Sequence, residues 1–304
     1  MKVLASRRLP GPAWDELRDV AYLDGPLPEG LGGERRGVEA LAVVGERVEA
    51  GSLDLLPDLR LVANYGAGYD LIDVEECRRR GVAVTNTPGV LDAAVADLTF
   101  ALILAVRRRV VEADGFVRAG RWAHHWAEPY LVGGDIGAAT LGIVGLGNIG
   151  SAVARRARAF DMRVLYTRRR SEESELGEQR PLDDLLGEAD VVTLHVPLTP
   201  ETTHLLDRRR LALLPDGACL INTARGQVVD EDALLDELAS GRLRAGLDVF
   251  AHEPHVPERL RALPNAVLAP HIGSATKETR SAMTRLVVDN ILAAAAGRPL
   301  VTPV

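Results

Sequence analysis

Short apolar runs separated by polar, glycine-rich turns recur along the first third of the chain. The segments "MKVLAS", "ALAVVG", "LRLVANYG" and "GVAVTNTPG" each have the length of a strand. Continuous apolar runs of this kind are typical of strands that are buried on both faces of a sheet. A short helix is predicted over residues 12–19, between the first two strands. The alternation predicts an open α/β sheet whose ligands gather at the carboxyl ends of its strands.

A different pattern occupies residues 92–109, which are apolar almost all round before the run "RRR". Such a stretch predicts a long helix that is buried on several sides. Behind it the strand pattern returns in "ATLGIVG", "MRVLY", "ADVVTLHVPL", "ACLINTA", "AGLDVF" and "AVLAPH". A last helix is predicted over residues 277–296, with Gly297 and Pro299 just beyond it. The chain is therefore predicted to be an α/β protein with two doubly wound parallel-sheet domains.

Composition and charge narrow the classes of protein. The 304 residues are 47% hydrophobic and carry a formal net charge of −7, which argues against a binder of nucleic acid or of anionic membranes. The apolar residues 93–106 are too few to span a bilayer, and the N-terminus lacks the apolar region of a signal peptide. Cys77 and Cys219 show no metal-ligand spacing. We expect a cytoplasmic protein without a metal site.

The segment "GLGNIG", residues 145–150, directly follows the apolar strand "TLGIV" and opens a predicted helix. In this context the G-x-G-x-x-G pattern predicts a dinucleotide site. The glycines permit a tight turn and a close approach of the backbone, and the pyrophosphate meets the free N–H groups at the helix N-terminus. A strand–turn–helix junction with incidental glycines is the alternative. The residues expected to contact the cofactor here are Gly145, Leu146, Gly147, Asn148, Ile149 and Gly150.

The end of the next strand carries Thr167, Arg168, Arg169 and Arg170 where such folds usually place one acidic residue. An acid would accept hydrogen bonds from the adenosine ribose hydroxyls and would repel a 2′-phosphate. Guanidinium groups instead pair bidentately with phosphate, and a threonine hydroxyl can donate beside them. The alternative is a solvated basic turn that contacts nothing. The pattern favours NADP(H) over NAD(H).

Three further residues with reactive side chains each stand near the end of a predicted strand: Arg225, Glu253 and His271. Taken singly, each has an ordinary structural interpretation, as a surface ion-pair partner, a turn residue before Pro254 and a packed histidine. Asp248 has one too, as a cap at a strand end. The residues by themselves therefore leave the chemistry open.

The segments "NYGAGYDLID", "GVAVTNTPGVLDAAVADLTFALIL", "TLGIVGLGNIG", "HVPLTPETTHL", "INTARGQVVDEDAL", "AGLDVFAHEP" and "NAVLAPHIGSAT" occur in this order along nearly the whole chain. With them the chain resembles the D-isomer-specific 2-hydroxyacid dehydrogenase family, and within it the glyoxylate/hydroxypyruvate reductases. The resemblance implies hydride transfer between a nicotinamide cofactor and a small 2-keto acid. It leaves open glyoxylate, hydroxypyruvate or a bulkier keto acid as the natural substrate.

Carried over residue by residue, the resemblance makes Arg225, Glu253 and His271 the catalytic residues. A histidinium can donate a proton to the developing alkoxide, a carboxylate beside it favours the charged ring, and an arginine can fix the substrate carboxylate. Gly66, Ala67 and Gly68 match the family's substrate-carboxylate loop, whose amides would form an anion nest; a plain turn is the alternative. Further residues that match cofactor-lining positions are Thr99, Thr199, Thr223, Ala224, Asp248 and Gly273.

The resemblance also implies the domain organisation. Residues 1–94 and 275–304 would form a flavodoxin-like substrate-binding domain, and residues 95–274 a Rossmann dinucleotide-binding domain, with the site in the cleft between them. A homodimer through the cofactor domains is expected, with Trp122 or Trp126 reaching the neighbour's active site. His195 is expected to be structural, because the acid–base role already falls on His271.

Two other functions fit the same motifs. One is a phosphoglycerate dehydrogenase-like enzyme without a regulatory domain, and the other is a non-enzymatic dinucleotide sensor that shares this fold. Sensors of this kind retain similar catalytic residues, so turnover of a 2-keto acid is the observation that separates them from the enzyme.

Overall fold

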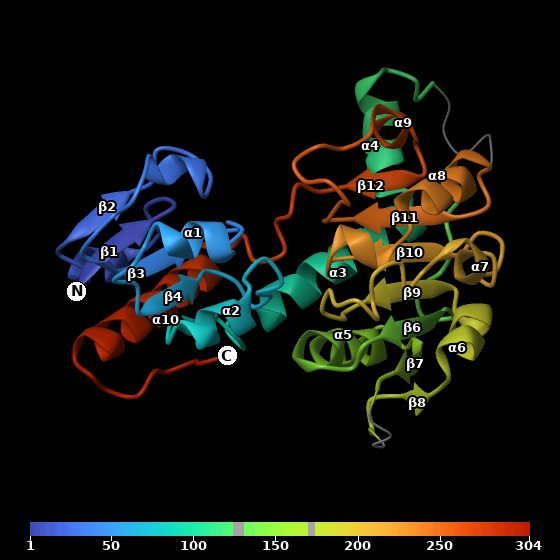
Figure 1. Cartoon of the computed structure of the whole chain (residues 1–304). Helices are drawn as coiled ribbons and strands as arrows, with labels where there is room; N and C mark the ends of the chain where they lie inside the picture. The colour runs from blue at the N-terminus through green and yellow to red at the C-terminus, as the bar shows by residue number, and fades with distance from the viewer. Residues whose placement is uncertain (124–130, 170–173) are drawn as a thin grey trace. The chain divides into compact units, whose positions relative to one another are not determined.

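The computed structural model describes residues 1–123, 131–169 and 174–304. The chain divides into two compact units, residues 1–92 with 274–304 (unit 1) and residues 93–273 (unit 2). Each unit is built on one parallel sheet with helices on both faces (Figure 1), which confirms the predicted fold class. Their roles in binding substrate and dinucleotide remain predictions. Among the described residues, no helix is long and apolar enough to cross a membrane.

The sheet of unit 1 has the strand order β2-β1-β3-β4-β5, which is the flavodoxin-like order. Its strands are β1 (Lys2–Ala5), β2 (Val20–Tyr22), β3 (Val38–Val43), β4 (Leu61–Asn64) and β5 (Ala83–Thr85). The short β2 had no counterpart in the strands expected from the sequence.

Helices cover both faces of this sheet because successive strand residues point to opposite sides. Val62 packs with the cluster that includes Leu53 of α1 (Ala50–Asp54) and Cys77 of α2 (Val74–Arg79), whereas its neighbour Leu61 packs with Val287 of α10 (Lys277–Ala295). The helices of unit 1 are η1 (Pro12–Glu16), η2 (Glu29–Leu31), α1 (Ala50–Asp54), α2 (Val74–Arg79) and α10 (Lys277–Ala295).

The helix predicted over residues 12–19 was partly wrong. It is the 3-10 helix η1, which ends at Glu16. Leu17 adopts an extended backbone while its N–H bonds back to the Trp14 carbonyl, and β2 begins three residues later at Val20. The buried Trp14 side chain anchors this turn to the core, and the chain continues in extended form from Leu17 toward β2.

The sheet of unit 2 has the order β12-β11-β10-β9-β6-β7-β8. Numbered from β6, this is the Rossmann order, with its reversal between β6 and β9. The strands are β6 (Thr140–Val144), β7 (Arg163–Thr167), β8 (Glu178–Gln179), β9 (Val191–Leu194), β10 (Cys219–Asn222), β11 (Arg244–Leu247) and β12 (Ala266–Leu268).

Two apolar clusters hold helices of unit 2 against its sheet. One cluster joins α3 (Asp92–Arg107) and α5 (Asn148–Ala159) to one face, and the other joins α6 (Leu182–Glu188) and α8 (Glu231–Ala239) to the opposite face. The predicted long helix is α3, and it ends at Arg107 because Arg109 adopts a left-handed backbone with φ 55°. The helices are α3 (Asp92–Arg107), α4 (Val110–Arg118), α5 (Asn148–Ala159), α6 (Leu182–Glu188), α7 (Arg208–Leu211), η3 (Gly226–Val228), α8 (Glu231–Ala239) and α9 (Glu258–Arg261).

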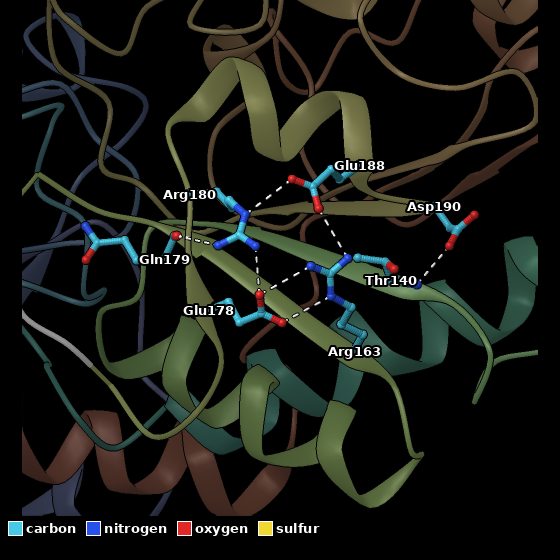
Figure 2. A network of polar contacts seen from close by, with 7 residues as sticks. All are labelled: Thr140, Arg163, Glu178, Gln179, Arg180, Glu188 and Asp190. Atoms are coloured by element: carbon cyan, nitrogen blue, oxygen red, sulfur yellow. Dashed lines mark hydrogen bonds and ion pairs between the residues drawn. The ribbon is translucent and has the colours of Figure 1, made fainter.

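A closed ring of ion pairs ties β7, β8 and α6 together at the edge of this sheet, and Figure 2 shows it. Glu178 bonds Arg163 at 3.1 Å and Arg180 at 2.7 Å, and Glu188 bonds the same two arginines at 3.2 and 3.3 Å. Exposed ion pairs contribute little singly and more as a network. The ring anchors the start of β8, and hence the far end of the loop that carries Arg168.

Candidate active site

The structure brings the predicted catalytic side chains together at one edge of the unit 2 sheet. His271 follows β12 and Glu253 follows β11, and the His271 Nδ1 lies 2.7 Å from the Glu253 Oε2. Arg225 follows β10, and its positive charge acts on both of these side chains. The segments after three neighbouring parallel strands thus supply a hydrogen-bonded pair of His and Glu beside a guanidinium group.

Gly226 explains how the turn with Arg225 can lie so close to Glu253. A Cβ atom at Gly226 would overlap the backbone of Phe250 and Ala251. The Gln227 side chain also donates to the Ala251 carbonyl at 2.7 Å. Only glycine allows the η3 turn to pack directly on the segment that leads to Glu253.

Asn222, at the end of β10, fixes the turn from inside and was not singled out from the sequence. Its side chain is buried, donates to the Arg225 carbonyl at 2.8 Å and accepts from the Ala224 N–H at 3.0 Å. An asparagine at a strand end followed by a turn is a known signal for such bonds. That signal could have identified Asn222 before the structure.

Asp248 caps the segment that carries His271. The carboxylate is 1% exposed and accepts from the N–H groups of Ile272 at 2.7 Å and Gly273 at 2.8 Å. The His271 N–H donates to the Asp248 carbonyl at 2.8 Å, and His271 has a left-handed backbone with φ 53°. Such a conformation persists in a non-glycine residue only where its surroundings hold it. The predicted contact of Asp248 with the cofactor stays a prediction.

The charges of the His271–Glu253 pair stabilise each other. The hydrogen bond that His271 donates to the Glu253 carboxylate outweighs burial and raises the pKa of His271 above its ordinary value of 6.5. Burial alone would raise the pKa of Glu253, but the bonds from His271 and the Phe250 N–H lower it overall. The pair therefore favours imidazolium beside carboxylate near neutral pH.

The pKa of His195 is shifted in the opposite direction to that of His271. Burial lowers its pKa to about 3, and its Nε2 lies 2.9 Å from the hydroxyl of the buried Thr193. A ring that stays neutral at physiological pH cannot act as an imidazolium acid. This agrees with the expectation that His195 is structural.

The glycine loop after β6 fits a dinucleotide pyrophosphate. Gly145 has φ +98°, and a Cβ there would meet the His195 carbonyl, while a Cβ at Gly150 would meet the Gly145 carbonyl. Helix α5 begins directly after Gly147, which provides no side-chain cap. Its first N–H groups thus have no side-chain acceptor at the cap position, which is the arrangement that receives a phosphate.

The loop beyond β7 presents the predicted basic residues. Thr167 ends the strand, and the Arg168 guanidinium lies 5.6 Å from the centre of the Tyr166 ring. Arg170 lies outside the described residues. An acid that sequence reasoning missed, Glu201, accepts from the Thr199 hydroxyl at 2.7 Å. This bond, with a smaller contribution from the charge of Arg169, lowers the pKa of Glu201.

Two of the other predicted cofactor-lining residues contact each other. The Thr99 hydroxyl donates to the Val95 carbonyl at 2.8 Å and lies 3.0 Å from the Thr223 hydroxyl. With its own hydrogen committed to Val95, Thr99 accepts from Thr223. The pair joins α3 to the turn that contains Ala224 and Arg225.

The predicted substrate loop lies in unit 1 and follows β4 in the sequence. Asn64 is buried, and its Nδ2 donates to the carbonyls of Gly66 at 3.1 Å and Gly68 at 2.8 Å. The Asn86 Nδ2 donates to the Ala67 carbonyl at 2.8 Å. All three carbonyls of the loop are thus held by asparagine side chains.

Helix α4 exposes apolar side chains. None of its residues is buried, and Val110, Val111 and Val117 are each more than half exposed. Trp122, four residues beyond the helix, is 55% exposed, and Trp126 lies outside the described residues.

The sequence of this chain is similar to that of a known enzyme family and its members. Residues 100–273 match the model of the NAD-binding domain of D-isomer-specific 2-hydroxyacid dehydrogenases. The chain is 48% identical to the glyoxylate reductase of Pyrococcus furiosus over 289 residues, which cover 92% of this chain and 84% of that one.

Solved structures are similar over the full length of the chain. A protein from Thermus thermophilus is 47% identical, with a TM-score of 0.93 and complete coverage of both chains. The NADPH-dependent glyoxylate/hydroxypyruvate reductase of Sinorhizobium meliloti, in complex with NADP and malonate, is 36% identical with a TM-score of 0.90. In that pair the match covers 100% of this chain and 96% of the other.

Replacing Gly226 by alanine is expected to lower the free energy of unfolding by about 1–3 kcal/mol, because the added methyl group must displace backbone. Gly187 is the matched control, since a Cβ there meets nothing within 4 Å and Gly187→Ala in α6 should raise stability by about 0.5–1 kcal/mol. Urea titrations of both variants measure the difference. Equal effects of the two substitutions would contradict the close approach at Gly226.

Proposed function

The chain belongs to the D-isomer-specific 2-hydroxyacid dehydrogenase family, and on that premise we propose that it reduces glyoxylate and hydroxypyruvate to their 2-hydroxy acids with NADPH. As a member of this family it is an oxidoreductase that uses a nicotinamide dinucleotide. The observation that supports the proposed direction and substrate class is the His271–Glu253 pair, at 2.7 Å, beside Arg225.

Reduction of a keto group adds one hydride to the carbon and one proton to the oxygen. When bound, NADPH would supply the hydride. His271 supplies the proton: its Nδ1 faces Glu253, so Nε2 is the ring nitrogen that holds the transferable proton. Glu253 keeps the ring charged before the step and orients it. The reverse reaction returns the proton to the neutral ring.

Recognition of the substrate carboxylate is assigned to positive groups. A guanidinium such as Arg225 pairs with a carboxylate bidentately and stabilises charge that develops on the neighbouring keto oxygen. The loop Gly66–Gly68 supplies backbone amides, and its small side chains leave room for an anion. Glyoxylate is named for several relatives of this chain, and hydroxypyruvate is named with it for the Sinorhizobium meliloti relative. Both are small 2-keto acids that suit such groups.

The preference for NADPH rests on the end of β7. Thr167 stands where an acid would exclude a 2′-phosphate, and Arg168 and Arg169 follow it. The ring of Tyr166 lies under the Arg168 guanidinium, which gives that side chain a fixed platform. The Sinorhizobium meliloti relative is described as NADPH-dependent, which supports the same choice here.

A second copy of this chain is the proposed cover for helix α4. Three exposed valines and the exposed Trp122 follow one another within a short stretch of unit 2, and apolar side chains gathered on a surface favour association. We place the homodimer interface there, with Trp122 as the residue that reaches the partner.

The NADPH preference predicts the behaviour of an Arg168→Asp variant. Losing a charge-assisted contact with the 2′-phosphate and adding a repulsive carboxylate should raise the KM for NADPH by about 10- to 100-fold and change the KM for NADH little. Initial rates with both cofactors measure this. Arg78→Asp, on the exposed side of α2, makes the same charge change and should leave both KM values as they were. An unchanged cofactor ratio in Arg168→Asp would refute the assignment.

The proton-donor role of His271 predicts a pH dependence. Since the pKa of His271 is raised, kcat/KM for keto acid reduction should hold at low pH and fall as the pH rises through a midpoint above 6.5. Glu253→Gln removes the largest cause of that shift, so the midpoint should move to lower pH and the neutral-pH rate should drop about 10- to 100-fold. Glu258→Gln is the control. If the midpoint of the pH profile is the same in Glu253→Gln as in the wild-type protein, the pairing of His271 with Glu253 is contradicted.

The proposed interface predicts that Val111→Asp shifts the protein from dimer to monomer in analytical ultracentrifugation, because a buried, unpaired carboxylate opposes association. Val301→Asp places the same charge at another exposed valine and should leave the dimer intact. A wild-type protein that is monomeric at micromolar concentration and fully active would exclude both the interface and the role of Trp122.

A further inference from the structure

The C-terminal residues run beside β5 in unit 1. The Val304 N–H donates to the Val84 carbonyl at 3.0 Å, and Thr85 pairs with Pro303 in an antiparallel bridge. The Asn86 N–H donates to the Thr302 carbonyl at 3.3 Å. This segment therefore reaches the end of β5, where Asn86 begins the next turn.

The Thr302 hydroxyl joins this segment to two asparagines. It donates to the Asn86 carbonyl at 2.6 Å and accepts from the Asn290 Nδ2 at 2.9 Å. Asn290 lies on α10 and is fully buried. Its Oδ1 accepts from the N–H groups of Val301 at 2.9 Å and Thr302 at 3.1 Å, so one side chain fixes both the backbone and the hydroxyl of Thr302.

The same chain of bonds continues into the predicted substrate loop. Asn86 is held through its backbone by Thr302, and its Nδ2 donates to the Ala67 carbonyl at 2.8 Å. A path of hydrogen bonds thus leads from Asn290 through Thr302 and Asn86 to Ala67. In a protein interior such connected bonds strengthen one another and specify one arrangement.

Holding the Ala67 carbonyl fixes the direction of one amide. In a trans peptide the C=O and the next N–H point in opposite directions, so a carbonyl of Ala67 that points to Asn86 aims the Gly68 N–H the other way. Asn64 does the same for the Ala67 N–H through the Gly66 carbonyl. Glycine peptides rotate easily, and a rotation here would present a carbonyl oxygen to the anion.

We propose that Asn290, Thr302 and Asn86 are positioning residues that set the amides of the substrate loop for a carboxylate. The proposal rests on the proposed function, in which Gly66, Ala67 and Gly68 bind the carboxylate of the 2-keto acid. None of the three side chains needs to touch the substrate. They act because an anion nest whose N–H groups are already aligned avoids the cost of ordering the loop on binding.

The test is Thr302→Val, which removes the hydroxyl and keeps the shape of the side chain. The KM for glyoxylate should rise about fivefold, with kcat within about twofold and the Kd for NADPH unchanged. Hydrogen exchange of the Ala67 and Gly68 amides should become faster. Thr302→Ser keeps the hydroxyl and should restore both readouts, and Val301→Ala, on the exposed neighbour, should change neither.

A second variant keeps the test decisive if Thr302→Val folds poorly. Asn86→Asp is isosteric but replaces the donor to the Ala67 carbonyl by an acceptor, so it should raise the glyoxylate KM further, by about tenfold. Unchanged loop exchange and unchanged KM in a folded, active Thr302→Val or Asn86→Asp protein would overturn the proposal. A wild-type protein that reduces no 2-keto acid would instead refute the proposed function, and the exchange rates would still decide whether these bonds hold the loop.

Discussion

The parallel pairing of β10, β11 and β12 is the constraint on which the candidate site depends. Parallel strands end at the same edge of a sheet, and β11 pairs with β10 on one side and with β12 on the other. Arg225, Glu253 and His271 each follow one of these strands, although 46 positions separate the first from the last along the chain. Gly226 then removes the side chain that would keep the first two loops apart. The pairing of the strands therefore determines that these three side chains lie at the same edge of the sheet.

Two carboxylates near this edge show how surroundings divide roles. Asp248 is almost completely buried and bonded by backbone N–H groups, and burial dominates, so its pKa is raised. Glu253 is also partly buried, but it faces the imidazole of His271, and its pKa is lowered. A charged partner stabilises a carboxylate more than neutral amides do. Asp248 therefore suits a structural cap for the backbone around His271, while Glu253 suits a partner that holds a proton on the ring.

Patterns local in the sequence predicted most of the fold, and contacts between distant residues account for what they missed. Apolar runs and the glycines of residues 145–150 predicted the strands and the turn before α5, since both depend on neighbouring residues. The catalytic residues came from the family resemblance, because Arg225, Glu253 and His271 have ordinary interpretations singly. The two-residue β8 and the hydrogen bonds of Glu201 and Thr302 were missed. They depend on which segments the fold brings side by side. A hydrogen bond from Thr302 to Asn86 produces no periodic pattern in the sequence.

Asparagine side chains perform the same task in both units. In unit 2, Asn222 holds the carbonyl of Arg225 and the N–H of Ala224, and in unit 1 Asn64 and Asn86 hold the carbonyls of the loop behind β4. A primary amide offers two donors and one acceptor at the end of a short side chain. It can therefore form hydrogen bonds with the backbone C=O and N–H groups of a turn that water does not reach. Each carbonyl that is satisfied inward leaves the opposite N–H directed outward. A turn whose carbonyl groups are held in this way gains both stability and direction from one residue, which explains why asparagine, and not an apolar side chain, occupies these strand ends.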